Sequence, residues 1–586
     1  MVEAGPSGRT DRRGPSDSWD PRRHLSTGGA IRCRSRHPYG VNRPADLSWG
    51  VFSDRAPWVL ADEPQAWQAH LHLVREATRR SAPELARPRK VPPLGRLATV
   101  TRHLGVGVAR WAATDRRDPD RSVAGLSLRL RIAAEALGPT YIKLGQIISS
   151  GEGIFPDELV DEFKRCRDRV RAEPFADVRR VVEEDLGRPL EAVFAAFDRE
   201  PLAAASIAQV HAATLRTGES VVVKVQRPQV ATLVQEDLRV MAWLAPLFVG
   251  RIPVAALANP PALVELFAET IVEELDFRLE AENMLDVSRS MRELGQQAYV
   301  IPRPHPELVT RRVLVMERLS GFALDEVDAM KAAGVDLMAL IRTGIIGFLE
   351  GAMFHGVFHG DLHGGNLFVQ PDGRTALLDF GITGRLDEPR RLAFLKLLAG
   401  GSTNDVRVQL PALAELGALP LDTDFEALIA ELGLDAPAVD PTQMDPDEMV
   451  GELQRVLKAL LGYGARMPKE LMLFVKNMAF STSMGQTLAP DLDILELIQQ
   501  VIVHFATTHG ERIAADLQQE YDPDAYLAEV SLDGYRASLG MPDAEAITLA
   551  ELQARRRLIR DRLSKRSRKG GTHYTPTGPE KDPVGR

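Results

Sequence analysis

The 586-residue chain is poor in cysteine, in aromatic residues and in excess positive charge. Its only two cysteines, Cys33 and Cys166, lie far apart and lack metal-ligand spacing, so we expect neither a disulfide framework nor a zinc site. A reduced, cytoplasmic setting fits this composition. The formal net charge of -9 gives no global basic field, so no nucleic-acid partner is expected.

Long uninterrupted hydrophobic runs are also missing. The run VMAWLAPLFVG is broken by Arg251 and Pro253 before it could span a bilayer core of about 30 Å. A second run, LIRTGIIGFLEGAMFHGVF, contains Arg342, Glu350 and His355. Both runs are interpreted as buried helices, and no transmembrane helix is predicted. The first residues lack the apolar region of a signal peptide.

Composition and periodicity divide the chain into five parts. Residues 1–93 are rich in Arg, Pro, Ser and Gly and are predicted to be mostly disordered, with a short helix possible in WQAHLHLVREATRR. Helical periodicity covers 94–195, a strand-bearing region covers 196–320, and a mainly helical region covers 321–510. Residues 511–586 form a polar and basic tail, interpreted either as a solvated tail or as a contact for an anionic lipid surface or RNA.

Three strand patterns locate the sheets. VHAATL and SVVVKVQ alternate around a turn at 216–219 and predict a β-hairpin. VLVMERLSG reads as a buried strand, and the short runs NLFVQ and TALLDF flank a turn at Pro371-Asp372-Gly373. A small strand-bearing region before a larger helical one, joined by a strand-ended hinge, is the two-lobe plan of protein kinases. We therefore predict an α+β, bilobal kinase-like fold.

The segments HGDLHGGNLFV and LLDFG carry the strongest chemical signal. Asp361 and Asn366 have the D-x4-N spacing of a kinase catalytic loop, and Asp379 follows in a DFG motif. Phosphoryl transfer needs a carboxylate to take the hydroxyl proton and oxygen ligands to hold magnesium against the phosphates. Asp361 is thus the predicted catalytic base, and Asn366 and Asp379 are the predicted metal ligands. His359 and His363 could suggest a metal site, but a kinase-type loop uses the first histidine to brace its backbone.

Lys224, in VVVKVQ, is the predicted phosphate-binding lysine. A lysine in an apolar strand is costly unless its ammonium reaches a phosphate and a carboxylate. EELDFRLEAENM supplies Glu280 as the counter-ion, four residues after Asp276 on the same helix face. The alternative is a lysine at an edge strand whose head reaches solvent.

Two backbone segments complete the predicted nucleotide site. Where a kinase has a glycine-rich phosphate cover, this chain has Ala203, Ala204, Ala205 and Ser206. Alanine restricts positive φ, so fewer backbone amides should reach the phosphates. The segment Glu317–Leu319 is the expected adenine-binding hinge, with Met316 lining the back of the pocket.

Two further motifs distinguish this chain from aminoglycoside and choline phosphotransferases, whose catalytic loops look similar. Lys143-Leu144-Gly145-Gln146 precedes the nucleotide lobe, and Glu274-Leu275-Asp276 precedes Glu280 and Asn283. Together with the alanine-rich loop they resemble the KxGQ, ExD and AAAS signatures of the ABC1/AarF/UbiB atypical kinase family. The resemblance covers roughly 94–500.

This resemblance implies a kinase-like fold whose N-terminal helical extension lies over the active site. It implies that Lys143 pairs with Glu274 or Asp276 and that Gln146 sits near the phosphates; Lys143 and Gln146 share one helix face. It further implies ATP and Mg²⁺ as cofactors, and ATPase or small-molecule kinase activity in quinone or other isoprenoid-lipid metabolism. Leu362 and Gly364 replace prolines common in the family, which should loosen the catalytic loop.

The sequence therefore predicts an ATP- and magnesium-dependent atypical kinase or ATPase that supports isoprenoid quinone or lipid biosynthesis. Its expected partner is a small molecule or lipid such as a quinone precursor. Its expected place is the cytoplasm, with peripheral contact to the inner face of the membrane. Two alternatives stay open: a nucleotide-binding regulator or lipid-presenting scaffold with little turnover, and a small-molecule phosphotransferase of the aminoglycoside or choline type.

Overall fold

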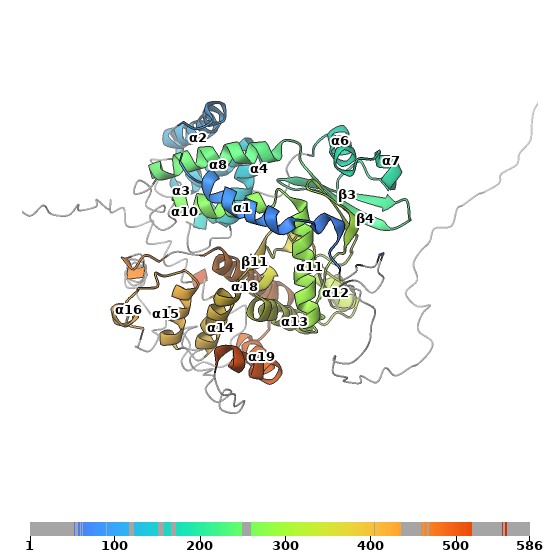
Figure 1. Ribbon diagram of the computed structural model, residues 1–586. Helices are drawn as coiled ribbons and strands as arrows, with labels where there is room; N and C mark the ends of the chain where they lie inside the picture. Colours follow the sequence, from blue (N-terminus) through green and yellow to red (C-terminus); the bar gives the residue numbers. More distant parts are fainter. Residues whose placement is uncertain are drawn as a thin grey trace, which may run out of the picture. The chain divides into compact units, whose positions relative to one another are not determined.

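The computed structural model describes residues 63–88, 91–115, 122–149, 157–165, 172–248, 260–402, 405–434 and 468–518, with a few isolated positions besides. All of them belong to one compact unit that begins at Ala45 (Figure 1). Cys33 and Cys166 lie outside the described residues. The same is true of almost all of the predicted basic tail.

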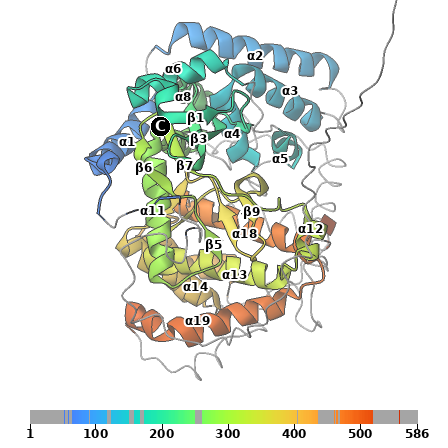
Figure 2. The same ribbon diagram turned by 90° about the vertical axis from the view of Figure 1, so that its right-hand side faces the viewer.

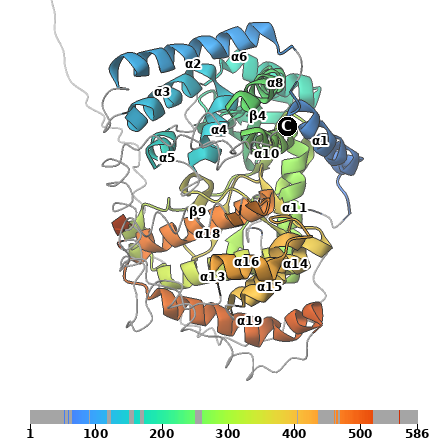
Figure 3. The ribbon, with the colours of Figure 1, turned by 90° about the vertical axis from the view of Figure 1, so that its left-hand side faces the viewer.

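The N-terminal extension is a layer of helices beside the nucleotide lobe (Figures 2 and 3). It comprises the 3₁₀ turn η1 (Ala66–Gln68) and the helices α1 (Leu71–Leu85), α2 (Leu94–Thr114), α3 (Ser122–Leu137), α4 (Pro139–Ser149) and α5 (Asp157–Lys164). Helices α3, α4 and α5 pack on one another, and α4 also packs on α8 (Val230–Phe248).

The short helix considered possible in WQAHLHLVREATRR is present as η1 and α1, and it is packed against the rest of the fold rather than isolated. Helix α1 packs against α10 (Pro260–Glu273) and α8, and its first residue, Leu71, is buried. Arg75 reaches Glu282 at 2.5 Å and fixes the helix to a distant part of the chain. These contacts are long-range, so the composition of the segment did not reveal them. Residues 1–51 lie outside the described residues.

The small lobe is built on an antiparallel sheet in the order β1-β3-β4-β7-β6, and the short strand β2 also pairs with β3. The predicted hairpin is confirmed: β3 pairs with β4, and Gly218 takes the positive φ of 104° that the turn requires. Its strands are β1 (Phe194–Phe197), β2 (Ala203–Ala204), β3 (Ala208–Leu215), β4 (Ser220–Gln226), β6 (Pro304–Val309) and β7 (Val313–Glu317).

Helices cover the small-lobe sheet on both sides. Two helices, α6 (Phe175–Leu186) and α7 (Leu190–Val193), bury valine and leucine side chains against one face of β4 and β7. They belong with the sheet, although the sequence grouped them with the extension. The helix α11 (Phe277–Glu293) packs near β6 and β7 and leads down to the large lobe, as Figure 1 shows.

The large lobe is mainly helical, as predicted. Its helices are α12 (Val327–Ala332), α13 (Leu337–Glu350), the π-helical turn η2 (Gly351–His355), α14 (Glu388–Ser402), α15 (Val406–Glu415), α16 (Phe425–Leu432), α18 (Lys469–Leu488) and α19 (Ile494–Leu517). The predicted boundary at residue 510 is wrong, because α19 continues to Leu517. Among the described residues, Leu337–His355 has the length and apolarity of a membrane span, and most of it is buried inside this lobe.

Short strands hold the functional loops of the large lobe. The predicted pair is present: β9 (Leu367–Val369) and β10 (Thr375–Leu377) are antiparallel, and β10 also pairs with β5 (Tyr299–Val300). A second pair, β8 (Val357–His359) and β11 (Thr383–Arg385), was not predicted, because its strands are separated in the sequence by β9 and β10 and not joined by a turn.

Candidate nucleotide and phosphoryl-transfer site

The β8–β11 ladder brings the catalytic loop and the DFG segment together. His359 lies opposite Thr383, and the Gly360 N–H donates to the Ile382 carbonyl at 2.9 Å. Further along, the Leu378 N–H donates to the Asn366 carbonyl at 3.0 Å. Two loops that are separated in sequence are thus fixed side by side by backbone hydrogen bonds.

Within these loops the predicted metal ligands are oriented by their neighbours. The Asn366 amide donates through Nδ2 to the Asp361 carbonyl at 3.0 Å, which leaves its Oδ1 as an acceptor. Asp379 Oδ1 accepts from the Gly381 N–H at 2.9 Å. Oxygen donors of this kind, an amide and a carboxylate, suit Mg²⁺. Asn366 and Asp379 therefore have the chemistry to hold a magnesium ion.

Lys224 stands in the middle of the sheet and points at two carboxylates. It lies opposite Val210 on β3 and Leu314 on β7. Its Nζ is 2.7 Å from Glu280 Oε1 and 3.2 Å from Asp379 Oδ1. The predicted partner is present, and Lys224 is nearly fully buried, so the edge-strand alternative does not apply.

Asp276 is not the residue that pairs with Lys143, one of the two alternatives that the family resemblance left open. It is the N-cap of α11, where its carboxylate accepts from the Arg278 N–H and pairs with Arg278 Nη2 at 2.7 Å. It therefore does not serve as the partner of Lys143. By starting the helix at Phe277, this cap places Glu280 one turn later, facing Lys224.

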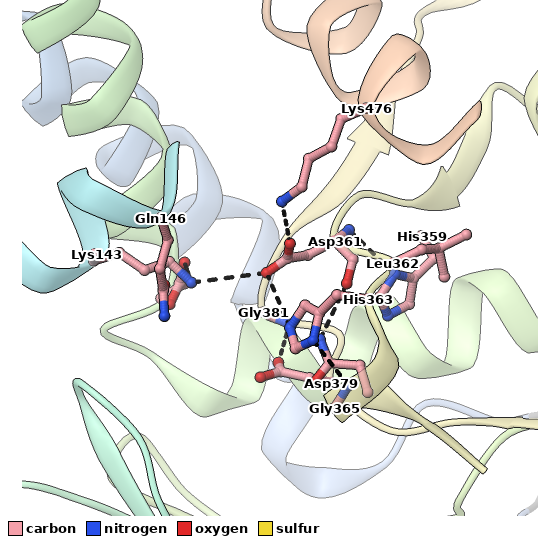
Figure 4. A network of polar contacts seen from close by, with 12 residues as sticks. Lys143, Gln146, His359, Asp361, Leu362, His363, Gly365, Asp379, Gly381 and Lys476 are labelled. Carbon is pink, nitrogen blue, oxygen red and sulfur yellow. Dashed lines mark hydrogen bonds and ion pairs between the residues drawn. The ribbon is translucent and has the colours of Figure 1, made fainter. Parts of the chain in front are cut away.

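Lys143 comes from α4 in the extension and pairs with Glu274. Its Nζ is 2.9 Å from Glu274 Oε1 and 4.0 Å from Asp361 Oδ2, and its side chain is only 10% exposed. Figure 4 shows Lys143 joined to Asp361 from the side of the extension, with Gln146 on the same helix. The extension thus places a cation next to Asp361, the predicted catalytic carboxylate.

The glycine of the KxGQ segment has a packing reason. A Cβ placed on Gly145 would lie 2.3 Å from a ring carbon of Phe163 on α5, well inside van der Waals contact. Gly145 lets α5 lie close to α4, and the two helices pack together. An alanine at this position would push the helices apart and shift Lys143.

Two residues of the site, Lys476 and Asn477 on α18, were not predicted from the sequence. Lys476 Nζ contacts Asp361 Oδ1 closely (Figure 4). The fully buried Asn477 accepts from the Leu362 N–H at 3.0 Å and donates to the His359 carbonyl. The available signal was a Lys-Asn pair inside the apolar helix segment LMLFVKNMAF. Nothing in the segment's spacing indicated which loop it would meet.

His359 and Asn283 act as structural supports. His359 Nδ1 accepts from the Asp361 N–H at 3.2 Å, and its ring packs edge-on against Phe380. Burial lowers the pKa of His359 to about 4, so the ring is neutral at neutral pH. Asn283 donates to the Phe380 carbonyl at 2.9 Å and so holds the DFG backbone from α11. These contacts agree with a bracing role for His359.

The alanine-rich loop and the hinge already use several of their backbone groups in hydrogen bonds within the protein. The Ala205 N–H donates to Ala208 in a tight turn, and its carbonyl accepts from Arg227, so this residue offers no free amide to phosphate. At the hinge, the Glu317 N–H donates to the Arg303 carbonyl, and the Glu317 carboxylate lies 3.6 Å from Arg303. Within the described residues, Arg318 and Leu319 are the hinge positions whose backbone makes no hydrogen bond.

Opposite charges are concentrated in the site. Burial opposes ionisation of Asp361, but Lys476, Lys143 and His363 outweigh it and hold the pKa of Asp361 well below its usual range. Burial also opposes ionisation of Asp379, and its lysine neighbours lower its pKa in the same way. With every group ionised, three ammonium groups face four carboxylates. The ammonium groups are those of Lys143, Lys224 and Lys476, and the carboxylates are those of Glu274, Glu280, Asp361 and Asp379.

The sequence is similar to a family of kinase-like proteins. The family model of the ABC1 atypical kinase-like domain matches residues 165–409. An uncharacterized protein of Mycobacterium tuberculosis is 36% identical over 60% of this chain and 73% of its own. An aarF domain-containing protein kinase of Arabidopsis thaliana is 32% identical over 63% and 73%, and a probable protein kinase UbiB of Marinobacter nauticus is 32% identical over 63% and 68%.

The chain belongs to the ABC1/AarF/UbiB family. Its fold is the kinase-like α+β fold predicted from the sequence. A solved chain titled as a complex of Rv3197 with erythromycin, from Mycobacterium tuberculosis, is 21% identical, covers 59% of this chain and 91% of that one, and has a TM-score of 0.34. The catalytic and metal-binding roles given to individual residues stay predictions.

One departure from the ABC1-family pattern has a structural consequence. Leu362, at a position where proline is common in the family, was expected to loosen the catalytic loop. The structure contradicts this expectation, because Leu362 is held in place. Its N–H, which proline would lack, donates to Asn477, and the side chain is buried. Gly364, by contrast, has open space around it.

Proposed function

We propose that this ABC1-family chain is an ATP- and magnesium-dependent atypical kinase or ATPase. One observation carries the proposal: Lys224 and Glu280 from the small lobe meet Asp379 from the large lobe, with Asn366 and Asp361 on the adjoining loop. A lysine–glutamate pair beside a metal-binding carboxylate is the arrangement that kinases use to bind a triphosphate.

The residues divide the chemistry between them. Lys224 would bind the phosphates, and Asn366 and Asp379 would hold Mg²⁺, which supplies charge neutralisation for the phosphate oxygens. Asp361 would accept the proton of the attacking hydroxyl or water as the γ-phosphoryl group passes to that oxygen and ADP leaves. Its strongly lowered pKa keeps Asp361 in the basic form. Lys476, in contact with Asp361, would orient that carboxylate and offer positive charge to the transferred phosphoryl group.

The extension favours a small acceptor. Lys143 from α4 lies 4.0 Å from the Asp361 carboxylate, where a substrate hydroxyl would have to approach. A peptide acceptor would need to displace the helix, whereas a small polar group on a lipid or phenolic head group would need less room. We therefore propose a small-molecule or lipid ligand of the quinone-precursor class and a role in isoprenoid quinone or lipid biosynthesis. A cytoplasmic protein with peripheral contact to the inner face of the membrane fits this role.

The direct test is ATP turnover by the purified chain with Mg²⁺, with and without lipid vesicles or phenolic head-group mimics. Wild-type turnover above that of Asp361→Asn supports an enzyme. Equal and negligible rates for both would instead support a nucleotide-binding regulator or lipid-presenting scaffold. ATP affinity that is unchanged in Asp379→Ala would remove the assigned metal role.

One further variant separates the family interpretation from a phosphotransferase of the aminoglycoside or choline type. Lys143→Ala removes the cation that the extension places beside Asp361. Increased ATP turnover in this variant supports a restraint exerted by the extension. A decrease with no change in acceptor range favours a simple substrate-binding role for Lys143.

A further inference from the structure

A second cluster of ligand-type side chains lies in the large lobe, among residues that the proposed phosphoryl-transfer chemistry does not use. Glu350, the last residue of α13, faces His504 and His509 on α19. Glu350 Oε1 lies 3.0 Å from His504 Nε2 and 2.8 Å from His509 Nε2. Figure 2 shows α19 along the lower edge of the large lobe, below α13 and α14. Two imidazoles and one carboxylate converge there.

We propose that Glu350, His504 and His509 form a binding site for a zinc-class divalent cation. Two imidazole nitrogens and one carboxylate oxygen are a ligand set that Zn²⁺ accepts in tetrahedral geometry, with a fourth position left for water or another ligand. Ligand atoms about 2.1 Å from Zn²⁺ at tetrahedral angles lie about 3.4 Å apart. The two carboxylate–imidazole distances are slightly shorter, so a small outward movement admits the ion in place of the ring protons.

The carboxylate is held in position from the other side. Glu350 Oε2 accepts from Gln296 Nε2 at 2.8 Å. The Gln296 side-chain oxygen, Oε1, itself accepts from the N–H groups of Gln297 and Ala298, each at 2.8 Å. Such second contacts to a ligand carboxylate orient it and raise metal affinity. Oε1 is therefore presented to the two histidines by a rigid support.

Burial and charge favour a cation at this place. The Glu350 side chain is 4% exposed, and His509 is 12% exposed. Burial alone would raise the pKa of Glu350, but its hydrogen bonds to the two histidines and Gln296 lower it, so the group is an anion. The π-helical turn η2 begins directly after Glu350, and such turns occur frequently at functional sites.

A cavity beside the cluster gives access to it and room for a fourth ligand. A cavity of about 690 Å³ is lined by Glu350 and His504 together with Gln296, Arg342, Gln500 and Thr508. His504 is 33% exposed, so an ion can reach the cluster from this side. The cavity leaves room for a water molecule on the ion, as in zinc sites with one open position.

The test is metal binding by the full-length chain after treatment with a chelator and dialysis. Titration with Co²⁺, followed by visible absorption, is expected to give the spectrum of a four-coordinate ion at one-to-one stoichiometry, and Zn²⁺ should displace it. Glu350→Gln and His504→Gln should each weaken Zn²⁺ binding by about 100-fold or more, since even a supporting residue is worth 10- to 100-fold. Gln296→Ala should weaken it by about 10-fold or more.

Two controls keep the outcome decisive. His72→Ala removes an exposed histidine on α1 and should leave binding unchanged. Asp379→Asn removes a carboxylate of the nucleotide site and should also leave it unchanged. Wild-type affinity in His504→Gln, or binding that is lost in Asp379→Asn and kept in Glu350→Gln, would overturn the proposal. If Glu350→Gln does not fold, the more exposed His504→Gln decides alone.

Discussion

Removal of Lys143 should destabilise the fold by leaving a buried carboxylate without its cation. Lys143 Nζ lies 2.9 Å from Glu274 Oε1, and the two side chains are 10% and 6% exposed. Lys143→Met keeps the apolar stem but removes the ammonium group. Breaking a buried ion pair from one side costs about 3–5 kcal/mol, and we expect a loss of about 3 kcal/mol in the free energy of unfolding.

The double variant Lys143→Met/Glu274→Gln should recover much of that loss. With both charges gone, no unpaired charge remains, and replacing a buried pair by neutral groups is often close to neutral in stability. We expect a recovery of about 2 kcal/mol, within the range of coupling energies for residues in contact. Acidification should also reduce the deficit of the single variant, because burial already raises the pKa of Glu274 and the protonated group carries no charge.

Urea unfolding followed by circular dichroism measures these differences, with the m-value checked for each variant. An exposed pair serves as the matched control: Lys396 and Glu415 are 2.9 Å apart and 42% and 41% exposed. Lys396→Met should cost less than about 1 kcal/mol. A loss below about 0.5 kcal/mol for Lys143→Met, or a double variant no more stable than the single, would refute the buried-pair reasoning.

Three other outcomes are expected. Lys476→Met should lower ATP turnover about tenfold or more, because Asp361 loses the ammonium group that orients it. Lys469→Met removes a lysine of similar exposure on the same helix and should not lower turnover. Equal turnover in the two variants would exclude Lys476 from the chemistry. Asp379→Asn should weaken the dependence of ATP binding on Mg²⁺ concentration, and an unaltered dependence in a magnesium titration would contradict its role as a ligand. Burial lowers the pKa of His359 to about 4, so the contribution of the neutral ring to the free energy of unfolding is complete above about pH 6.5 and is lost as the pH falls towards 4. The difference in free energy of unfolding between wild type and His359→Asn should therefore shrink by up to about 3 kcal/mol over that range. A difference that stays constant in urea unfolding would contradict this.

Much of the nucleotide site could be predicted from the sequence, because residue type and spacing within short segments indicate it. Lys224 could be placed because a charged residue in an apolar strand needs a partner, and Glu280 followed from the acidic helix after it. Asp361, Asn366 and Asp379 have spacings that come from short loops. The hairpin and the β9–β10 pair were likewise predictable from alternation and turn residues.

The contacts that cross between distant segments were not readable in this way. The sequence left Glu274 and Asp276 as equal partners for Lys143, and the N-cap of α11 removed Asp276 from the choice. Lys476 sits in a helix whose pattern shows only that it is helical, and its contact with Asp361 depends on how α18 packs.

The amino-acid sequence by itself determined the kinase-like fold class, the order of the motifs and the hairpin that presents Lys224. Periodicity, turn residues and loop spacing are local properties, because each depends only on residues that are close together in the sequence. Only the tertiary structure decided the ordering of α1, the partner of Lys143, the contact of Lys476 and the meeting of Glu350 with two histidines on α19. Each of these depends on the packing of helices far apart in sequence, and packing geometry has no local pattern to predict it.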